Sequence, residues 1–377
     1  MQRKTVMLML ASVMALSMTG CGLGATQAPE TNTETAGASE GAGDSAASET
    51  PEAGGETGVY TNSTQTQGKT NEIVIKVSNG SSESHPTIQA QLNTFAPEIE
   101  EATGGRVGVE IYAGGQLGDD TTATEMVIAG QLECYNTSTA PLVSYVPELA
   151  MFDIPFLFED EAEADYVLDS EVTEYLNKKL EEKGLVCVSW NENGFRELTN
   201  SKRAVESVDD VKGLKIRTME NEFHQALWNS LGASAVPMSS NELYTALEQG
   251  TVDGEENPVP NFYAYQFHEV QDYVTITNHI YSPDLLIFSK KIWDTYDADV
   301  QEAIRAAAEH YTTEERRLNR EAIDEDLKLC EEGGMEVTRL TPEAKQAFVD
   351  ATIHIRDSIA ETTGPEIMEL LDKAGAK

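Results

Sequence analysis

From Asn71 onward, short apolar segments with strand-like spacing alternate with longer segments that have helical spacing. Residues 73–77 and 107–112 are expected to be strands, and residues 86–103 between them a helix. That helix carries apolar side chains three or four residues apart, at Ile88, Leu92, Phe95 and Ile99. Strands that alternate with helices favour an α/β fold over a β-sandwich or a helix bundle.

The same alternation continues towards the C-terminus. We expect further strands at residues 132–136, 185–190, 214–218, 274–277 and 285–289. We expect helices at residues 119–129, 161–183, 222–231, 241–249, 342–362 and 365–373, the fourth with Asn241 as its N-cap. Residues 297–330 differ from all of these, because they form one unusually long and highly charged helical pattern.

The N-terminus has the pattern of a secretion signal. Arg3 and Lys4 are followed by an apolar stretch, residues 6–18, that is too short to span a bilayer well. The sequence Met-Thr-Gly-Cys at residues 18–21 then resembles a bacterial lipoprotein box, although Met and Thr replace the commoner residues at its first two positions. We therefore expect residues 1–20 to be a signal peptide and Cys21 to carry lipid. The alternative is an ordinary secretory signal followed by a chance cysteine.

Residues 22–70 are rich in Gly, Ala, Ser, Thr, Glu and Gln and contain almost no large apolar side chain. Such a segment cannot bury enough surface to offset its conformational entropy. We expect residues 21–70 to be a lipidated cysteine with a disordered tether that holds a folded domain away from a membrane.

The chain is strongly acidic, with 65 Asp and Glu against 26 Lys and Arg and a net charge of -39. This charge argues against binding to nucleic acid or to an anionic membrane surface. Besides Cys21, the chain has Cys134, Cys187 and Cys330, whose odd number and wide spacing favour buried free thiols over a disulfide framework. The six histidines are scattered, so we expect no metal and no cofactor.

Three short motifs place polar groups at predicted strand ends. Arg217 ends the Gly-Leu-Lys-Ile-Arg sequence of residues 213–217, where its guanidinium could hold a carboxylate. Arg196 lies in Asn-Gly-Phe-Arg-Glu-Leu-Thr-Asn, and Asn257 follows a short strand bounded by glycine. Taken one at a time, each motif is also compatible with a surface ion pair or a common turn.

Together the motifs resemble the solute-binding proteins of TRAP-type transporters, the DctP-like family. Asn257 follows Arg217 by 40 residues, and the resemblance extends to residues 116–120, 241–247 and 277–279. It covers about residues 71–377 and implies a two-lobed fold like that of periplasmic binding proteins, with hinge strands and one long helix that spans both lobes. The implied lobe I comprises residues 71–194 and 283–322, and lobe II comprises residues 195–282 and 323–377.

The resemblance also implies a set of substrate-binding residues. Arg217 corresponds to the arginine that pairs with the ligand carboxylate, Arg196 to a second arginine of the cleft, and Asn257 to an amide that holds the carboxylate from the other side. Asp120 matches an acidic residue that contacts ligand hydroxyls in sugar-acid binders. Ser138 occupies the position where sialic-acid binders carry Glu, which argues against sialic acid.

Three further candidates complete the expected site. His85 lies in the first strand-to-helix loop, which faces the cleft in the family, although a capping or solvated histidine is the alternative. Trp190 is expected to line the cleft or to pack in the core. Ser240, directly before the helix expected at residues 241–249, is the third.

The implied function is capture of a solute outside the cell, without catalysis. The ligand would be a carboxylate-bearing metabolite, with a sugar acid such as a uronate or aldonate favoured over a four-carbon dicarboxylate or a keto acid. The receptor would be lipid-anchored, on the outer face of the cytoplasmic membrane or in the periplasm, and would deliver its ligand to a TRAP membrane permease. The alternatives are a ligand-sensing partner of a signalling receptor and a lipid-anchored extracellular hydrolase, for which no GxSxG, HExxH or P-loop motif is present.

Overall fold

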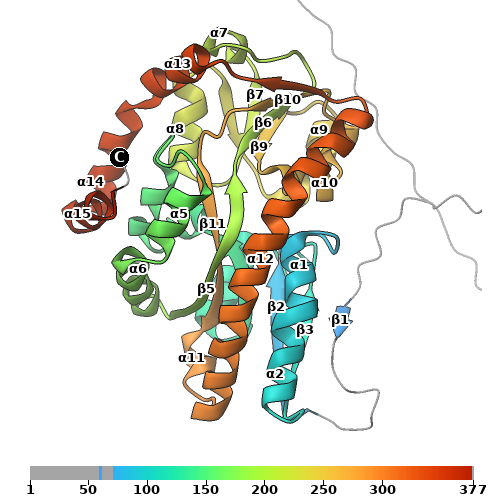
Figure 1. The fold of residues 1–377 in the computed structure, drawn as a ribbon, viewed down its shortest axis with the longest axis vertical. Helices are drawn as coiled ribbons and strands as arrows, with labels where there is room; N and C mark the ends of the chain where they lie inside the picture. Colours follow the sequence, from blue (N-terminus) through green and yellow to red (C-terminus); the bar gives the residue numbers. More distant parts are fainter. Residues whose placement is uncertain (1–58, 62–70, 376–377) are drawn as a thin grey trace, which may run out of the picture. The chain divides into compact units, whose positions relative to one another are not determined.

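The computed structural model describes residues 59–61 and 71–375. These residues form two six-stranded mixed sheets, each with helices packed against it (Figure 1). The predicted signal peptide, Cys21 and most of the predicted tether lie outside the described residues. Among the residues described, no helix combines the length and the apolar character that crossing a membrane would require.

The first sheet has the strand order β1-β3-β2-β4-β11-β5. Strand β2 runs parallel to β3 and β4, whereas β11 is antiparallel to β4 and β5. The strands are β1 (Val59–Thr61), β2 (Ile73–Asn79), β3 (Val107–Tyr112), β4 (Cys134–Ser138), β5 (Leu185–Phe195) and β11 (Tyr281–Ser289). The predicted strands are all present, and β5 and β11 extend well beyond the apolar runs that predicted them.

The second sheet has the order β12-β10-β6-β9-β7-β8. Its strands are β6 (Glu197–Asn200), β7 (Lys215–Thr218), β8 (Ser234–Pro237), β9 (Gly254–Asn257), β10 (Tyr273–Ile276) and β12 (Glu336–Arg339). The edge strands β8 and β12 were not among the predictions, because each has only four residues, all of them exposed or half-buried, and so lacks an apolar pattern.

Two chain segments join the sheets. Strand β5 continues through Arg196 into β6, and β10 leads through residues 277–280 into β11. The two crossing segments are hydrogen-bonded to each other, since Arg196 N donates to Ile280 O over 2.9 Å. This arrangement confirms the predicted hinge strands between two α/β lobes, one built on each sheet.

The helices confirm the α/β prediction with several differences in extent. They are α1 (Pro86–Ala90), η2 (Gln91–Phe95), α2 (Ala96–Ala102), α3 (Asp120–Ala129), α4 (Thr139–Leu142), η3 (Pro147–Asp153), α5 (Glu161–Leu168), α6 (Glu171–Glu182), α7 (Val208–Val211), α8 (Glu222–Ser230), α9 (Ser240–Glu248), α10 (Val259–Ala264), η4 (Phe267–Glu269), α11 (Lys290–Trp293), α12 (Ala298–Glu332), α13 (Pro342–Thr352), α14 (His354–Thr363) and α15 (Pro365–Lys373).

Capping side chains explain where two helix predictions were wrong. Residues 161–183 form two helices rather than one, because the Ser170 hydroxyl accepts a hydrogen bond from Val172 N and starts α6. Helix α9 is capped by Ser239, not by Asn241, since Ser239 Oγ accepts from Asn241 N. Helix α3 ends as predicted at Gly130, whose φ of 78° is the left-handed conformation that glycine adopts without strain.

Helix α12 spans both lobes, as predicted (Figure 1, orange). Near its start, Ile304 and Tyr311 are buried in the apolar cluster of the first sheet. Towards its end, Leu327 and Cys330 are buried in a different apolar cluster, together with side chains of α9 and α10. The same helix therefore contributes to the cores of both lobes.

Polar side chains in the middle of α12 hold β5 at Glu192. Glu192 N donates to Glu315 Oε2 over 2.8 Å, and Asn319 Nδ2 donates to Glu192 O over 2.6 Å. Arg320 Nε donates to the Glu192 carboxylate over 2.7 Å. Burial raises the pKa of Glu315 well above its usual range. The backbone and side chain of this one residue of β5 are thus fixed by three groups of the connecting helix.

The C-terminal helices α13, α14 and α15 contact elements of both predicted lobes. Helices α13 and α14 pack against α8, α14 also packs against η3, and α15 packs against η3 and α6. The segment 323–377 that was predicted for lobe II therefore also contacts elements that were predicted for lobe I, and the predicted boundaries stay a prediction.

The three cysteines in the described part of the chain are free and buried, as predicted. Burial raises the pKa of Cys134 well above its usual range, and it raises the pKa values of Cys187 and Cys330 to about 12.

Gly254, at the start of β9, generates a prediction about stability. A Cβ atom there would lie 2.1 Å from Thr199 O of the neighbouring β6, so an alanine would push the two strands apart. We expect Gly254→Ala to lower the free energy of unfolding by about 1–3 kcal/mol in urea titrations. Gly80→Ala is the control, because its Cβ would have no atom nearer than 3.9 Å. Equal stability of the two variants would contradict the prediction.

Candidate functional site

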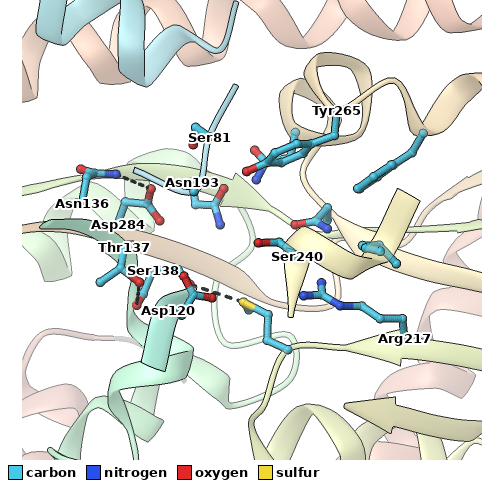
Figure 2. Close-up of a pocket in the computed structure, with 16 residues that line it drawn as sticks. Ser81, Asp120, Asn136, Thr137, Ser138, Asn193, Arg217, Ser240, Tyr265 and Asp284 are labelled. Carbon is cyan, nitrogen blue, oxygen red and sulfur yellow. Dashed lines mark hydrogen bonds between the residues drawn. The ribbon is translucent and has the colours of Figure 1, made fainter. Parts of the chain in front are cut away.

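A cavity of about 540 Å³, including the part open to solvent, lies where elements of both lobes meet (Figure 2). Most of its lining groups are hydroxyls, amides and carboxyls. The lining residues are Gly80, Ser81, Asp120, Asn136, Thr137, Ser138, Asn193, Arg217, Met219, Ser240, Leu243, Asn257, Asn261, Tyr265, Phe267 and Asp284. A concave site on which several polar groups converge is typical of small-molecule binding.

The ends of parallel strands supply many of the lining groups. Ser81 follows β2, and Ser138 ends β4, which is parallel to β2. Arg217 lies near the end of β7, and Asn257 ends β9, which is parallel to β7. Ligands of open α/β sheets bind outside the carboxyl ends of the strands. The cavity occupies that position for both sheets.

Arg217 is the predicted carboxylate-binding residue, and it lines the cavity. Its side chain is 2% exposed, and its Nε donates to Met238 O over 2.8 Å. Its guanidinium points into the cavity (Figure 2). Burial lowers the pKa of Arg217, while the charges of Glu255 and Glu256 oppose that effect. One edge of the guanidinium is therefore fixed by the backbone, and its outer end faces the cavity.

Arg196 does not line the cavity, although it contacts a residue that does. It is fully buried, with its Nε 2.5 Å from Glu256 Oε2. Its Nη2 donates to Asn257 Oδ1 over 3.2 Å, and Asn257 Nδ2 donates to Glu255 Oε2 over 2.5 Å. These contacts fix the orientation of the Asn257 amide. Arg196 Nη1 is buried without a hydrogen-bond partner in the described structure. Because Arg196 is not among the lining residues, its direct contact with ligand stays a prediction.

A buried charged network lies around Glu256. His224 bridges two acids, with Nδ1 3.3 Å from Glu256 Oε1 and Nε2 3.1 Å from Asp153 Oδ1. His279 Nε2 lies 3.0 Å from Glu256 Oε2. Burial alone would raise the pKa of Glu256, but the charges of Arg196 and His224 hold it well below its usual range. The network connects η3 and α8 to the strand that carries Asn257.

The remaining predicted residues fall into two groups. Asp120, Ser138 and Ser240 line the cavity. Trp190 does not, because its ring packs against Phe152 and its Nε1 donates to Asn177 Oδ1 over 2.9 Å, beside a different groove.

His85 does not line the cavity but contacts a residue that does. It is the N-cap of α1, and its Nδ1 accepts from Thr87 N, so its other nitrogen, Nε2, must carry the proton that is donated to Asn261 Oδ1 over 2.9 Å. Asn261 lines the cavity. Burial lowers the pKa of His85 to about 4, so the ring is neutral at physiological pH. The structure shows His85 positioning Asn261, and contact of His85 itself with ligand stays a prediction.

Comparison with known proteins gives the family. The family described as "Bacterial extracellular solute-binding protein, family 7", or DctP, matches residues 77–363. The chain belongs to the DctP family. Within it, a solute-binding protein of Verminephrobacter eiseniae is 42% identical over 235 residues, which are 62% of this chain and 69% of the relative. The 2,3-diketo-L-gulonate-binding periplasmic protein YiaO of Escherichia coli is 31% identical, over 74% of this chain and 84% of the relative.

Solved structures of DctP-family proteins confirm the two-lobed fold. The sugar acid binding protein DctPAm of Advenella mimigardefordensis, in complex with galactonate, matches with a TM-score of 0.78 and 36% identity, covering 80% of this chain and 97% of that protein. A TRAP periplasmic solute-binding protein of Sulfurospirillum deleyianum with bound succinate matches with a TM-score of 0.77 and 31% identity, covering 81% and 99%. These relatives are solute receptors rather than enzymes.

Several lining residues of this DctP-family chain were not predicted from the sequence. Asn136 closes a predicted strand and Asn193 belongs to a quoted motif, so the same reasoning from strand ends could have found them. Tyr265 lies in a short segment with Tyr263 and Phe267, and such a group of aromatic residues is equally typical of a packed core. The sequence pattern did not mark Asp284 as a site residue. It directly precedes the apolar run of β11, whereas reasoning from strand ends finds polar residues that follow such runs.

The His224 bridge generates a prediction about pH. Burial lowers the His224 pKa, but Glu256 and Asp153 outweigh it and raise the pKa to about 9, above the usual 6.5. Protonated His224 therefore stabilises the fold fully below pH 6.5, and this contribution is lost as the pH rises through 9. We expect the stability difference between wild type and His224→Gln to shrink by about 1–3 kcal/mol from pH 6 to pH 9.5 in urea titrations.

The exposed His310, changed to Gln, serves as the control, because it lies outside the buried network around Glu256. A stability difference for His224→Gln that stays constant or grows with pH would show that Glu256 and Asp153 do not hold the His224 proton.

Proposed function

We propose that this chain is the extracytoplasmic receptor of a TRAP-type transporter and that it binds a carboxylate-bearing metabolite, which it delivers to a membrane permease. The observation that supports this most directly is the Arg217 guanidinium, which faces a cavity at the carboxyl end of β7. A guanidinium matches a carboxylate with two parallel hydrogen bonds. The Asn257 amide, held by Arg196 and Glu255, lines the same cavity.

A sugar acid is the ligand class that the lining favours. Arg217 is the one cationic side chain among the described residues that line the cavity, whereas amides and hydroxyls are numerous. One carboxylate with several hydroxyls therefore fits these groups better than two carboxylates do. Related receptors are described with galactonate, D-erythronate and D-glucuronate, although another is described with succinate. A four-carbon dicarboxylate or a keto acid is the next candidate.

Closure of the lobes would trap the ligand by hinge motion. Hydrogen bonds already join the two sides near the cavity, since Ser82 Oγ donates to Ala264 O over 3.0 Å and His85 bonds to Asn261. We infer that these contacts form when the lobes close. The hinge would bend near residues 195–196 and 277–283, with lobe I at 71–194 and 283–322 and lobe II at 195–282 and 323–377.

The acidity of the chain does not conflict with an anionic ligand. Charges on the exposed faces are screened within about 8–10 Å at physiological salt. Arg217, which is 2% exposed, acts at contact distance inside the cavity. The charge of -39 thus describes the solubility of the receptor and says little about what it binds.

Arg217 generates a prediction about affinity. Removing one partner of a buried charge pair costs about 2–5 kcal/mol, which corresponds to a loss of roughly 30-fold to several thousand-fold. We expect losses in this range for Arg217→Ala, and a smaller but clear loss for Arg217→Lys because the planar fork is lost. A thermal-shift screen of organic and sugar acids would select the ligand, and calorimetric titration would measure both variants.

Arg339→Lys is the matched control, because Arg339 is exposed on the edge strand β12. A loss of less than threefold in both Arg217 variants would refute the assignment of Arg217. If only neutral sugars or peptides stabilised the wild type, the receptor would not be an acid-binding protein.

The N-terminal sequence generates a prediction about localisation. We propose that residues 1–20 are removed and that Cys21 carries the lipid that anchors the receptor on the outer face of the cytoplasmic membrane or in the periplasm. Cys21→Ser should therefore move the protein from the membrane fraction to the soluble fraction and abolish labelling by a clickable fatty acid. Cys187→Ser is the control, because Cys187 is a buried thiol of the folded part. Membrane association that survives Cys21→Ser would favour another means of attachment.

A further inference from the structure

Strand β11 places a carboxyl group in the cavity wall at a position where burial is costly. Asp284 is 6% exposed, and all nine residues of β11 are buried. The four residues that follow it in the strand, 285–288, are apolar. A carboxyl group in such surroundings requires hydrogen-bond partners to offset the loss of its hydration.

The protein supplies a partner for only one of the two oxygens. Asp284 Oδ2 accepts from Asn136 Nδ2 over 3.0 Å. The amide of Asn136 is itself fixed, since its Oδ1 accepts from Asn191 Nδ2 and from the Tyr311 hydroxyl, both over 3.3 Å. Asp284 Oδ1 is buried and has no hydrogen-bond partner in the described part of the chain. Figure 2 shows the Asn136–Asp284 pair beside Asn193 at the cavity wall, with Arg217 at some distance from it.

A second acid lines the same cavity. Asp120 lies at the start of α3, where its Oδ1 accepts a short hydrogen bond from the Tyr135 hydroxyl. Burial, and then the charge of Asp120, raises the pKa of Asp284 to about 7. Arg196, whose charge acts on Asp284, is already paired with Glu256. The cavity thus contains one cation and two acids.

We propose that Asp284 determines which acids this receptor accepts: its unpartnered Oδ1 accepts a hydrogen bond from a ligand hydroxyl, and together with Asp120 it rejects a second ligand carboxylate. This inference rests on the proposed function, in which Arg217 holds the first carboxylate. The ligand class is then a monocarboxylate that carries hydroxyls. A dicarboxylate held by Arg217 would have its second carboxylate near two acids and without a cation. The repulsion between these negative charges would select against dicarboxylates.

The structure explains why the discrimination should be strong. A ligand that lacks the hydroxyl leaves a buried carboxylate oxygen unpaired, and a site built around such a group rejects analogues that cannot pair with it. The fixed Asn136 amide prevents Asp284 from turning away, because rotation would break the Asn136 hydrogen bond. The same geometry therefore penalises both the missing hydroxyl and the additional carboxylate.

The test compares galactonate with succinate by calorimetry at pH 8.5, above the raised pKa of Asp284, so that its carboxyl group is ionised. The proteins are wild type, Asp284→Asn and Asp284→Ala. We expect wild type to bind galactonate and to bind succinate weakly or not at all. In Asp284→Asn, galactonate affinity should fall about tenfold or more, whereas succinate affinity should rise, because the amide removes a negative charge and offers a donor. Asp284→Ala should lose galactonate affinity too. Ser282→Ala is the control, since Ser282 is buried on the same strand but does not line the cavity.

The outcomes separate this inference from the proposed function. If Arg217→Lys weakens binding of both acids while Asp284→Asn leaves their affinity ratio unchanged, the role of Asp284 is refuted and the receptor function stands. Tight binding of succinate by wild type would also refute the inference alone. If wild type binds neither probe nor any acid in the screen, both ideas fail. Circular dichroism and melting temperatures show that the variants are folded, and the isosteric Asp284→Asn keeps the test valid should Asp284→Ala not fold.

Discussion

The buried ion pair between Arg196 and Glu256 is the interaction on which most of the site depends. Arg196 stands where β5 passes into β6, and Glu256 precedes Asn257 in β9, so the pair joins the hinge to the strand that carries a cavity amide. Burying two charges is costly unless additional hydrogen bonds offset the loss of their hydration. His224 and His279 supply those contacts to Glu256, and His224 extends the network to Asp153 of η3. Arg196 thus lies behind the cavity and contacts the Asn257 amide that lines it.

The middle of α12 likewise holds a residue next to the cavity lining, on the other side of the hinge. Its groups hold the backbone and carboxylate of Glu192, and the adjacent Asn193 lines the cavity. A helix whose two ends belong to the cores of different lobes, and whose centre is bonded to a hinge strand, couples three parts of the molecule. A ligand that contacts Asn193 would therefore contact β5, the strand to which the centre of α12 is bonded.

The sequence predicted the parts of this architecture that local pattern controls. Arg217, Asn257 and Asp120 lie at strand or helix ends that glycine and capping residues mark, and the structure places all three at the cavity. The positions of Trp190 and Arg196 relative to the cavity were harder to predict. Side chains on one strand alternate between faces, and only the tertiary packing decides which face meets the cavity. Asp284 could not have been identified, since its partner Asn136 is 148 residues away and reaches it only through the pairing of β4 with β11.

The burial of the native thiols has a practical consequence for observing this receptor at work. A thiol whose pKa lies near 12 is almost entirely protonated at neutral pH, and the thiolate is the form that reacts with maleimides. Within residues 71–375, the native cysteines are therefore expected to react slowly with maleimides, which leaves little background for labelling at introduced sites. One cysteine introduced on the outer surface of each lobe would accept a fluorophore pair, and energy transfer between the dyes would record opening and closing of the native receptor in real time.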